Sequence, residues 1–201
     1  MDNKILIEQS QHWEKSFSSK PEMFGSEPSH SAKIALENFK KNNVKHIIEL
    51  GAGLGRDTIF FAKNSIKVTA LDYSPTAVEI IKNKTNSLGL GDLIEVQTHD
   101  LRQKLNFKDN SFDGCYSHML YCMAFTYSEL ENLNNEVCRV LNKLSLNIYT
   151  VRNHSDADYK KGTHRGEDLY EMNGYIVHYF SNEKIKKLVK GFKNISIDHF
   201  D

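Results

Sequence analysis

The sequence has little cysteine, and the cysteines that it has follow no pairing pattern. Only three, Cys115, Cys122 and Cys138, occur in 201 residues, and their spacing matches no metal-binding motif. An odd number without such pairing argues against a disulfide framework and against a zinc site. We expect the three side chains to be buried as small hydrophobic groups, and we predict no metal ion.

An excess of charge of one sign is also missing. Lysine and arginine together number 26, aspartate and glutamate also number 26, and the formal net charge is zero. Binding to nucleic acid depends on positive charge that displaces counterions from phosphates. The balance therefore argues against a nucleic-acid partner, although a local basic patch stays open.

Long hydrophobic runs are absent as well. No stretch approaches the roughly 18 to 20 apolar residues that a membrane-spanning helix needs. Residues 1–15 lack the apolar centre of a signal peptide. We therefore expect a cytoplasmic protein without a membrane partner.

Strand and helix patterns alternate along the chain, which favours an α/β fold with a mostly parallel sheet. The length suits one domain with a sizeable core. Predicted helices cover residues 8–17, 29–42, 56–64, 74–89, 128–141 and 182–190. Predicted strands cover residues 44–50, 67–71, 93–98, 112–117, 144–151, 175–180 and 195–199.

The most informative segment is Ile47–Asp57, which reads IIELGAGLGRD. An apolar strand leads into Glu49, and glycines follow at positions 51, 53 and 55 in the pattern E-x-G-x-G-x-G. Glycine is needed where a chain turns tightly or where its backbone approaches a ligand closely. The next strand ends at Asp72, whose carboxylate can accept hydrogen bonds from a ribose diol. Together these features predict the first β-α-β unit of a nucleoside-binding sheet.

The glycine spacing differs from that of a dinucleotide site, which reads G-x-G-x-x-G and faces a pyrophosphate. Here the third glycine comes one position early, and Glu49 suits a ligand that carries an amine rather than a phosphate. The segment resembles motif I of the class I S-adenosylmethionine-dependent methyltransferases. The resemblance covers roughly residues 44–197 and implies a doubly wound, mostly parallel, Rossmann-like sheet.

The resemblance also implies a set of cofactor contacts. Glu49 would hold the amino group of the methionine moiety and Arg56 its carboxylate, while Asp72 would accept the ribose hydroxyls. The remaining expected contacts are Gly51 and Gly53 beside the methionine moiety, and Tyr73, Asp100 and Leu101 around the adenine. Asp100 as a turn cap and Arg56 as a solvated surface charge stay open as alternatives.

Three residues after the fourth predicted strand would lie near the transferred methyl group: Ser117, His118 and Tyr121. Methyl transfer needs positioning, together with a base when the acceptor carries a proton. His118 is the candidate base because histidine titrates near neutrality, and Tyr121 is its candidate catalytic neighbour. A packing role for His118 stays open. The only prolines, at positions 21, 28 and 75, exclude the Pro-Pro motif of enzymes that methylate amino groups of DNA and glutamine.

Two flanking segments carry the substrate predictions. Residues 151–180 form a long polar insertion, and such loops often cover a site. Its candidate substrate residues are Arg152, Asn153, His154, Tyr159, His164, Tyr170 and His178. His164, Glu167 and His178 follow no strong metal-ligand spacing, and a solvated excursion stays open. Phe24 belongs to the segment MFGSEPS, which resembles a lid of small-molecule and tellurite-resistance-type methyltransferases.

These expectations divide a single methyltransferase domain into four parts. Residues 1–43 form a helical lid, 44–151 the cofactor-binding core, 152–180 the substrate-side insertion, and 181–201 a helix and a strand. The sequence stops after the first strand of the family's terminal hairpin, so we expect either a truncated form or a six-stranded sheet with an altered edge, and a monomer or a homodimer. We expect methyl transfer to a small molecule. A protein or RNA acceptor, and cofactor binding without catalysis, remain the alternatives.

Overall fold

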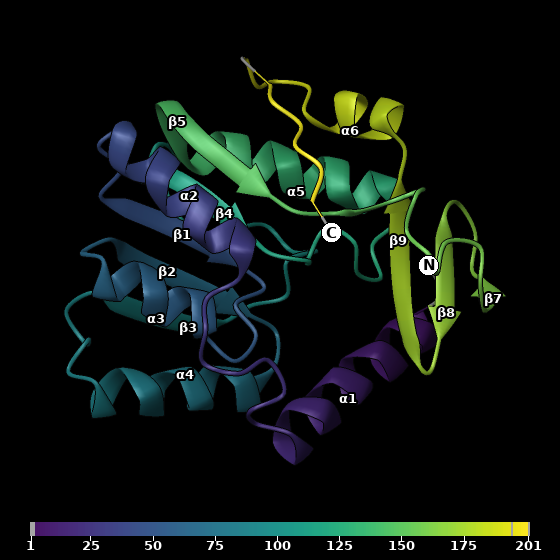
Figure 1. Cartoon of the computed structure of the whole chain (residues 1–201), viewed down its shortest axis with the longest axis horizontal. Coiled ribbons are helices and arrows are strands. Elements are labelled where there is room, and N and C mark those ends of the chain that lie inside the picture. Colours follow the sequence, from purple (N-terminus) through teal and green to yellow (C-terminus); the bar gives the residue numbers. More distant parts are fainter. Residues whose placement is uncertain (1–2, 194, 201) are drawn as a thin grey trace.

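The centre of the fold is a parallel five-stranded sheet, seen in a computed structural model that describes residues 3–193 and 195–200 (Figure 1). The strand order is β3-β2-β1-β4-β5. The strands are β1 (His46–Leu50), β2 (Lys67–Asp72), β3 (Ile94–Thr98), β4 (Phe112–Ser117) and β5 (Leu141–Tyr149). The predicted mostly parallel sheet is thus confirmed, and β1 lies between β2 and β4, where the order reverses. This reversal point is where open α/β sheets bind ligands.

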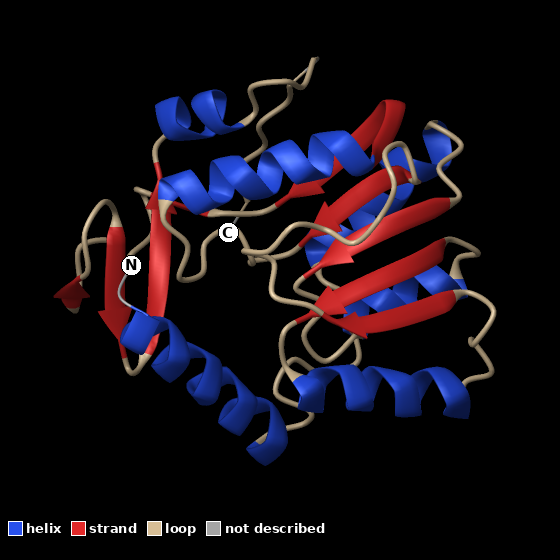
Figure 2. Ribbon diagram, turned by 180° about the vertical axis from the view of Figure 1, so that it is seen from behind, coloured by secondary structure: helices blue, strands red, loops and turns tan. Residues whose placement is uncertain are grey.

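Helices cover both faces of this sheet (Figure 2). One face carries α2 (His30–Lys41) and α3 (Arg56–Lys63), which share a core with the apolar side chains of β1 and β2. The other face carries α5 (Tyr127–Val140) and α6 (Asn182–Leu188). α4 (Pro75–Ser87) packs along β3 at the edge of the sheet. A sheet covered on both faces explains why its strands read as continuous apolar runs.

Local signals in the sequence account for several helix starts. Ser74 caps α4 by accepting from the Ala77 amide at 3.0 Å, and Pro75 occupies the first turn. Thr126 and Glu129 form a capping box at the start of α5. None of the helices in the described part of the chain is long and apolar enough to cross a membrane.

The first helix and the insertion differ from the prediction. α1 (Asn3–Ser19) extends well beyond the predicted 8–17 and stands apart from the main sheet (Figure 1). Residues 152–180 form a second sheet in the order β6-β9-β8-β7 rather than an irregular polar loop. Its strands are β6 (Arg152–Asn153), β7 (Thr163–His164), β8 (Leu169–Met172) and β9 (Tyr175–Phe180).

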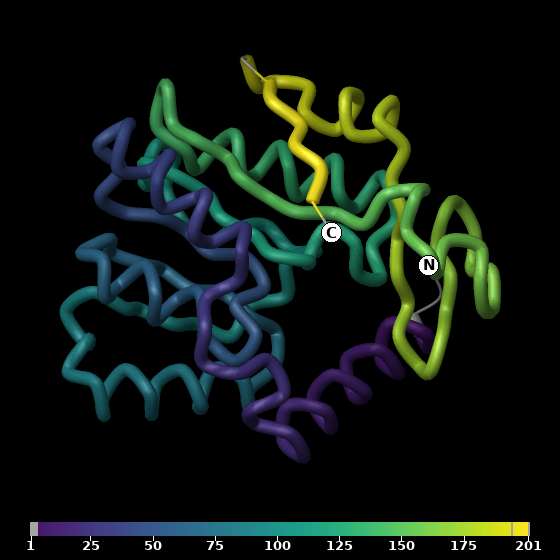
Figure 3. Tube along the Cα trace, in the orientation of Figure 1, coloured from purple at the N-terminus to yellow at the C-terminus, as the bar shows by residue number. Residues whose placement is uncertain are grey.

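The predicted strand over residues 195–199 is wrong. Residues 195–200 form no strand, and among the described residues β5 pairs only with β4. The alternation of Ile195 and Ile197 suggested a strand, but Ile197 instead packs against the core that includes α5 and α6. The tube in Figure 3 shows this last segment running back across the molecule from α6.

Candidate active site

A cavity of about 1150 Å³ lies at the carboxyl ends of the central strands. One side, the strand-end wall, consists of residues at or just beyond the carboxyl ends of β1, β2 and β3: Glu49, Gly51, Gly53, Asp72, Tyr73, Asp100 and Leu101. The opposite side, the apolar wall, comes from α1, the loop after β4 and the second sheet: Leu6, Ile7, Ser10, Met119, Met123, Arg152, Tyr170, Met172, Tyr175, Val177 and Tyr179. Figure 1 shows α1 spanning from the edge of the main sheet to the β8–β9 hairpin.

Many predicted site residues line this cavity. They include the cofactor candidates on the strand-end wall together with Phe24, Arg56, His118, Arg152 and Tyr170. These residues lie between 24 and 170 in the sequence and come from separate elements, so the fold brings them together. Their roles stay predictions, but the required proximity is present.

Asp72 holds the turn between the strand ends. One carboxylate oxygen accepts from the Gly53 amide at 2.8 Å, and the other accepts from the Ser74 amide at 2.9 Å. Burial raises the pKa of Asp72, and these two amide bonds oppose the rise. An ionised carboxylate has further lone pairs, so Asp72 can still accept bonds from a ligand in the cavity.

The Glu49 carboxyl has fewer hydrogen bonds within the described residues than that of Asp72. Its side chain is 3% exposed and accepts a hydrogen bond from the Thr58 hydroxyl at 2.6 Å. Burial, followed by the negative charge of Asp57, raises the pKa of Glu49 well above its ordinary value. The Thr58 bond opposes this rise, and Asp72 adds to it.

The glycines have different roles. Gly51 and Gly53 both have positive φ, +70° and +54°, and expose bare backbone on the strand-end wall. Gly55, at φ +80°, begins α3, and a Cβ there would lie 2.6 Å from the Ile81 side chain. The early third glycine therefore lets α4 pack closely against the start of α3.

Arg56 contacts the predicted lid segment. Its guanidinium donates to the Phe24 carbonyl oxygen at 3.0 Å and lies 5.7 Å from the centre of the Phe24 ring. This geometry favours a role in anchoring residues around Phe24 over the predicted contact with the cofactor carboxylate. Its guanidinium also lies 3.8 Å from Asp57.

His118 lines the cavity and is held through one ring nitrogen. Its Nδ1 lies 2.9 Å from the Ser31 hydroxyl and 3.1 Å from the Thr150 hydroxyl. Nε2 has no hydrogen-bond partner among the described residues, and the side chain lines the cavity. Burial lowers the pKa of His118, while the charge of Asp57 raises it and that of Arg56 lowers it. A neutral imidazole can accept a proton, as a base must.

The structure places Ser117 and Tyr121 outside the cavity, so these two predictions are corrected. Ser117 is fully buried and donates to the Leu50 carbonyl oxygen at 3.0 Å, which ties β4 to β1. Tyr121 is also fully buried and stacks on Tyr149 with ring centres 4.3 Å apart. Ser117 ends β4 and Tyr121 lies in the loop after it, both with buried side chains, so only His118 of the three lines the cavity.

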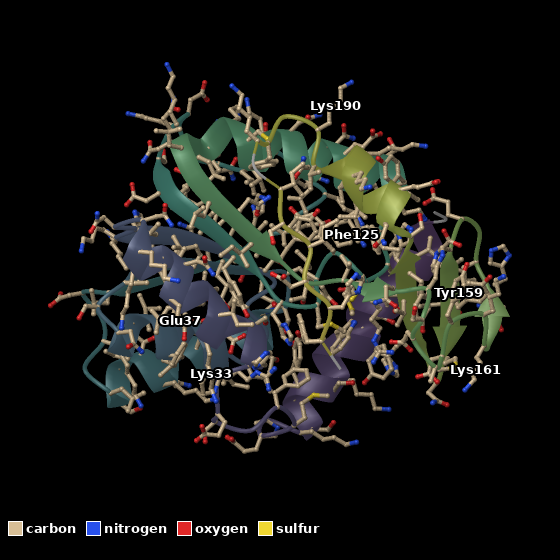
Figure 4. All side chains as sticks on the ribbon, turned by 45° about the horizontal axis from the view of Figure 1, so that its top comes forward. Lys33, Glu37, Phe125, Tyr159, Lys161 and Lys190 are labelled. Carbon is tan, nitrogen blue, oxygen red and sulfur yellow. The ribbon has the colours of Figure 1, made fainter. Side chains whose placement is uncertain are left out.

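Five residues of the insertion also miss the cavity: Asn153, His154, Tyr159, His164 and His178. They bond within the second sheet or to its neighbours. His178, for example, is fully buried between the Phe125 carbonyl oxygen at 2.8 Å and the Lys184 ammonium at 2.9 Å. Burial and the Lys184 charge lower its pKa to about 4, so it is a structural, neutral group. Figure 4 shows Phe125 at the centre of the molecule and Tyr159 beside the second sheet.

Sequence reasoning placed α1 in the predicted lid but named none of its residues as lining the site. Gln9 on α1 donates to the Gly174 carbonyl oxygen at 2.7 Å and accepts from the Ile176 amide at 3.1 Å. At the other end, Glu14 accepts hydrogen bonds from the hydroxyls of Ser74 and Thr76 at the start of α4. The spacing of Trp13 and Phe17 on one helical face was the available signal, since both line the cavity.

The strand-end wall fits a ligand that brings hydroxyl groups and positive charge. Glu49, Asp57 and Asp72 are three buried carboxylates on the cavity, and Arg56 is the cation beside them. S-adenosylmethionine carries an amine, a positively charged sulfur and a ribose diol, which such carboxylates can hold. The described residues contain no cluster of three or more histidine, cysteine or acidic side chains that could hold a metal ion.

Comparisons with known proteins agree with this geometry. Residues 47–143 match the family model described as a methyltransferase domain. Sterol 4-C-methyltransferase strm-1 of Caenorhabditis elegans is 28% identical over 96 residues, which are 48% of this chain and 28% of the relative. The 24-methylenesterol C-methyltransferase 3 of Arabidopsis thaliana is 27% identical over 177 residues, 81% of this chain and 48% of the relative. The chain thus spans less than half the length of both relatives.

Among solved structures, an S-adenosylmethionine-dependent methyltransferase from Clostridium acetobutylicum is similar with a TM-score of 0.69. The two are 15% identical, and the match covers 90% of this chain and 87% of that one. This likeness concerns the fold alone. By the family match, residues 47–143 are similar to a methyltransferase domain, and the chain shares the fold of this solved methyltransferase.

Proposed function

We propose that this protein transfers the methyl group of S-adenosylmethionine to a small-molecule acceptor by in-line displacement. The observation that carries the proposal is one cavity with two chemically different walls. The strand-end wall carries buried carboxylates and bare backbone, and the facing apolar wall carries methionine and tyrosine side chains. At about 1150 Å³ the cavity exceeds the roughly 300–1,000 Å³ of a typical single-ligand pocket, so two ligands can share it.

The strand-end wall would hold the methyl donor. Asp72 would accept the ribose hydroxyls, Glu49 the amine, and Tyr73 with Asp100 would flank the adenine. Bound there, S-adenosylmethionine supplies a methyl group already activated by its positive sulfur. The protein then has to orient the acceptor, exclude water and remove a proton where the acceptor carries one.

The apolar wall indicates the class of acceptor. Arg102, which also lines the cavity, is paired with Asp100 at 3.2 Å and Glu129 at 3.6 Å. Arg152 is the charged residue of the apolar wall, and its guanidinium lies 3.5 Å from Asp156 and 3.7 Å from Asp158. Its charge is therefore already balanced. Met119, Met123 and Met172 provide flexible, polarisable surface on the same wall. This lining favours an uncharged, largely apolar acceptor over an anion, and the sterol methyltransferase relatives support the same class.

His118 would act as the base at the junction of the two walls. As the acceptor oxygen, nitrogen, sulfur or carbon forms its bond to the methyl carbon, the carbon–sulfur bond breaks and its electron pair stays on sulfur. The proton lost by the acceptor passes to Nε2 of His118. Burial keeps this imidazole neutral before the reaction because it lowers the pKa.

The proposal includes a location and a lid. Residues 1–43 would close over both ligands, since α1 contributes to the apolar wall and Phe24 reaches the glycine turn. We also propose that the enzyme is cytoplasmic and works as a monomer or homodimer without nucleic acid. Cell fractionation tests the location, and light scattering of the purified protein tests the oligomeric state.

An acceptor screen tests the proposed reaction. Purified protein is incubated with S-adenosylmethionine and matched pairs of acceptors, one neutral and apolar and one bearing a carboxylate or phosphate, and S-adenosylhomocysteine is measured. We expect product with neutral acceptors and none from Asp72→Ala with any acceptor. Turnover restricted to anionic acceptors would refute the acceptor class. Absence of S-adenosylmethionine binding by calorimetry would refute the function as a whole.

A further inference from the structure

A chain of buried, hydrogen-bonded polar side chains connects His118 to the carboxylate of Asp57. Asp57 is in the first turn of α3, Ser29 and Ser31 begin α2, and Tyr116 is on β4. All four are buried, with exposed fractions of 6% or less. Nothing in the methyl-transfer step itself requires such a chain, and buried polar groups are costly unless they are fully paired.

The contacts are short and continuous. Asp57 Oδ2 accepts from the Ser29 hydroxyl at 2.7 Å and from the Tyr116 hydroxyl at 3.0 Å. The Ser31 oxygen lies 3.0 Å from that of Ser29, 2.9 Å from that of Tyr116, and 2.9 Å from His118 Nδ1. The chain thus connects the carboxylate of Asp57 to one ring nitrogen of the histidine.

Counting hydrogens fixes the direction of these bonds. An ionised carboxylate only accepts, and each hydroxyl has one hydrogen to donate. Ser29 and Tyr116 give their hydrogens to Asp57, so toward Ser31 they can only accept. Ser31 therefore donates its single hydrogen to one of them. Its oxygen is then an acceptor, and the hydrogen between Ser31 and the histidine has to come from Nδ1.

The opposite arrangement is worse. If Ser31 donated to Nδ1, both the 3.0 Å gap to Ser29 and the 2.9 Å gap to Tyr116 would lack a hydrogen, whereas the first arrangement leaves only one of them empty. The 2.9 Å gap between Ser29 and Tyr116 lacks a hydrogen in both arrangements, and the Ser29 oxygen still accepts from the Ala32 amide at 3.0 Å. The second arrangement therefore has one fewer hydrogen bond among buried groups, which is unfavourable. Thr150 favours the other tautomer. Its oxygen accepts from the Met119 amide at 2.8 Å, so its own hydrogen can be donated to Nδ1, which would place the imidazole hydrogen on Nε2.

We propose that Asp57 is a positioning residue that acts through Ser29, Tyr116 and Ser31 to hold His118 in the tautomer with hydrogen on Nδ1. The free electron pair is then on Nε2, the nitrogen without a protein partner. The value of this arrangement for catalysis rests on the proposed function, in which His118 is the base. The tautomer itself does not depend on that function.

The Ser31→Ala variant breaks the chain without removing either donor to Asp57. In the variant, Thr150 is the remaining partner of Nδ1 and donates to it, so the hydrogen of the imidazole moves to Nε2. Thr150→Val removes the competitor and keeps the hydrogen on Nδ1. A matched control is Thr69→Val, which removes the hydroxyl 2.9 Å from Nε2 of His46, away from the cavity.

The readout is nitrogen-15 NMR of protein labelled in histidine, in which the two tautomers differ in shift and coupling. The His118 signals are assigned by their loss in His118→Gln, and circular dichroism with thermal melting checks the fold of every variant. We expect the Nδ1–H form in the wild type and in Thr150→Val. Ser31→Ala should show the Nε2–H form, and Thr69→Val should change only His46.

Each result separates the inference from the proposed function. Nε2–H in the folded wild type, or Nδ1–H retained in folded Ser31→Ala, would overturn the positioning role whatever the activity. With an acceptor that carries a proton, the altered tautomer should lower kcat about tenfold or more while the S-adenosylmethionine affinity stays the same. A changed tautomer with unchanged kcat would uphold the positioning role and overturn the assignment of His118 as base.

Discussion

The raised pKa of Glu49 predicts that binding of the methyl donor releases a proton. In the free protein the carboxyl is 3% exposed, near Asp57 and Asp72, and burial favours its neutral form. An amine placed beside it favours the ionised form. Donor binding should therefore release up to one proton per site, and the affinity should rise with pH through the raised pKa of Glu49.

The magnitude follows from one charged hydrogen bond. Such a bond contributes about 1.5–3 kcal/mol, and about 1.4 kcal/mol corresponds to a factor of ten in Kd. Glu49→Gln keeps the size and the partner Thr58 but cannot ionise, so S-adenosylmethionine binding should weaken about 10- to 100-fold. The proton release should disappear together with the pH dependence.

The folding stability should depend on pH in the opposite direction to the donor affinity. The free folded protein holds a proton on Glu49 where the unfolded chain has lost it, so wild-type stability should fall as pH rises above the ordinary value of 4.5. Glu49→Gln should lack this loss. Calorimetry in two buffers of different ionisation enthalpy measures the released proton, and thermal melts measure stability. Equal proton release in wild type and Glu49→Gln would refute the assignment.

Four further predictions concern other groups of the site. Asp72→Ala should weaken S-adenosylmethionine binding at least about tenfold in calorimetry, and NAD should not bind the wild type; unchanged affinity would remove Asp72 from the site. His118→Ala should slow a protonated acceptor by roughly 10²–10⁴ but a pre-ionised one little, and equal losses would mean that His118 only packs or positions. Gln9→Ala loses two hydrogen bonds to the β8–β9 hairpin, so the acceptor KM should rise while the fold persists by circular dichroism; an unchanged KM would show that α1 is not the wall of the acceptor site. Tyr121→Phe should keep kcat, because the side chain lies in the core, and a large kcat loss would restore the catalytic prediction.

The sequence was most informative where structure is local. The turn after β1 needs glycines within a few positions, and Asp72 ends the next strand, so both could be recognised from short segments. The start of α4 at Ser74 and Pro75 is likewise a local signal. Gly51, Gly53 and Asp72 belong to the strand-end wall, which explains why residues of that wall could be named from the sequence.

The chain behind His118 could not be predicted because its members are far apart in sequence. Ser29 meets Asp57 across 28 positions, and Ser31 meets His118 across 87. A serine just before a helix is normally interpreted as an N-cap, and Ser29 is one. This role accounts for the serine fully, so the sequence does not indicate that its hydroxyl also donates to Asp57. Asp57, next to Arg56 in the glycine segment, similarly looks like a charge in the first turn of a helix.

The insertion shows the opposite error, since its polar composition suggested a binding loop. Its polar side chains mostly satisfy one another: Tyr159 donates to Asp168 at 3.0 Å, Lys184 bonds Asp168 at 2.7 Å, and His154 stacks on Tyr159. Composition cannot distinguish polar groups that bind a ligand from those that hold a small sheet together. Of the predicted substrate residues in the insertion, only Arg152 and Tyr170 reach the cavity, together with residues that were not predicted, such as Met172 and Val177.

α1 is hydrogen-bonded both to the start of α4, next to the strand-end wall, and to the second sheet. Its Glu14 bonds to Ser74, whose amide donates to Asp72, while its Gln9 bonds to the hairpin of the second sheet. A ligand that orders Asp72 would therefore act on the same helix that lines the proposed acceptor site. Closure of α1 would then be favoured by donor binding, which excludes water before the acceptor is committed. Closure before the acceptor reacts would be useful, because water left in the cavity would compete with the acceptor for the activated methyl group.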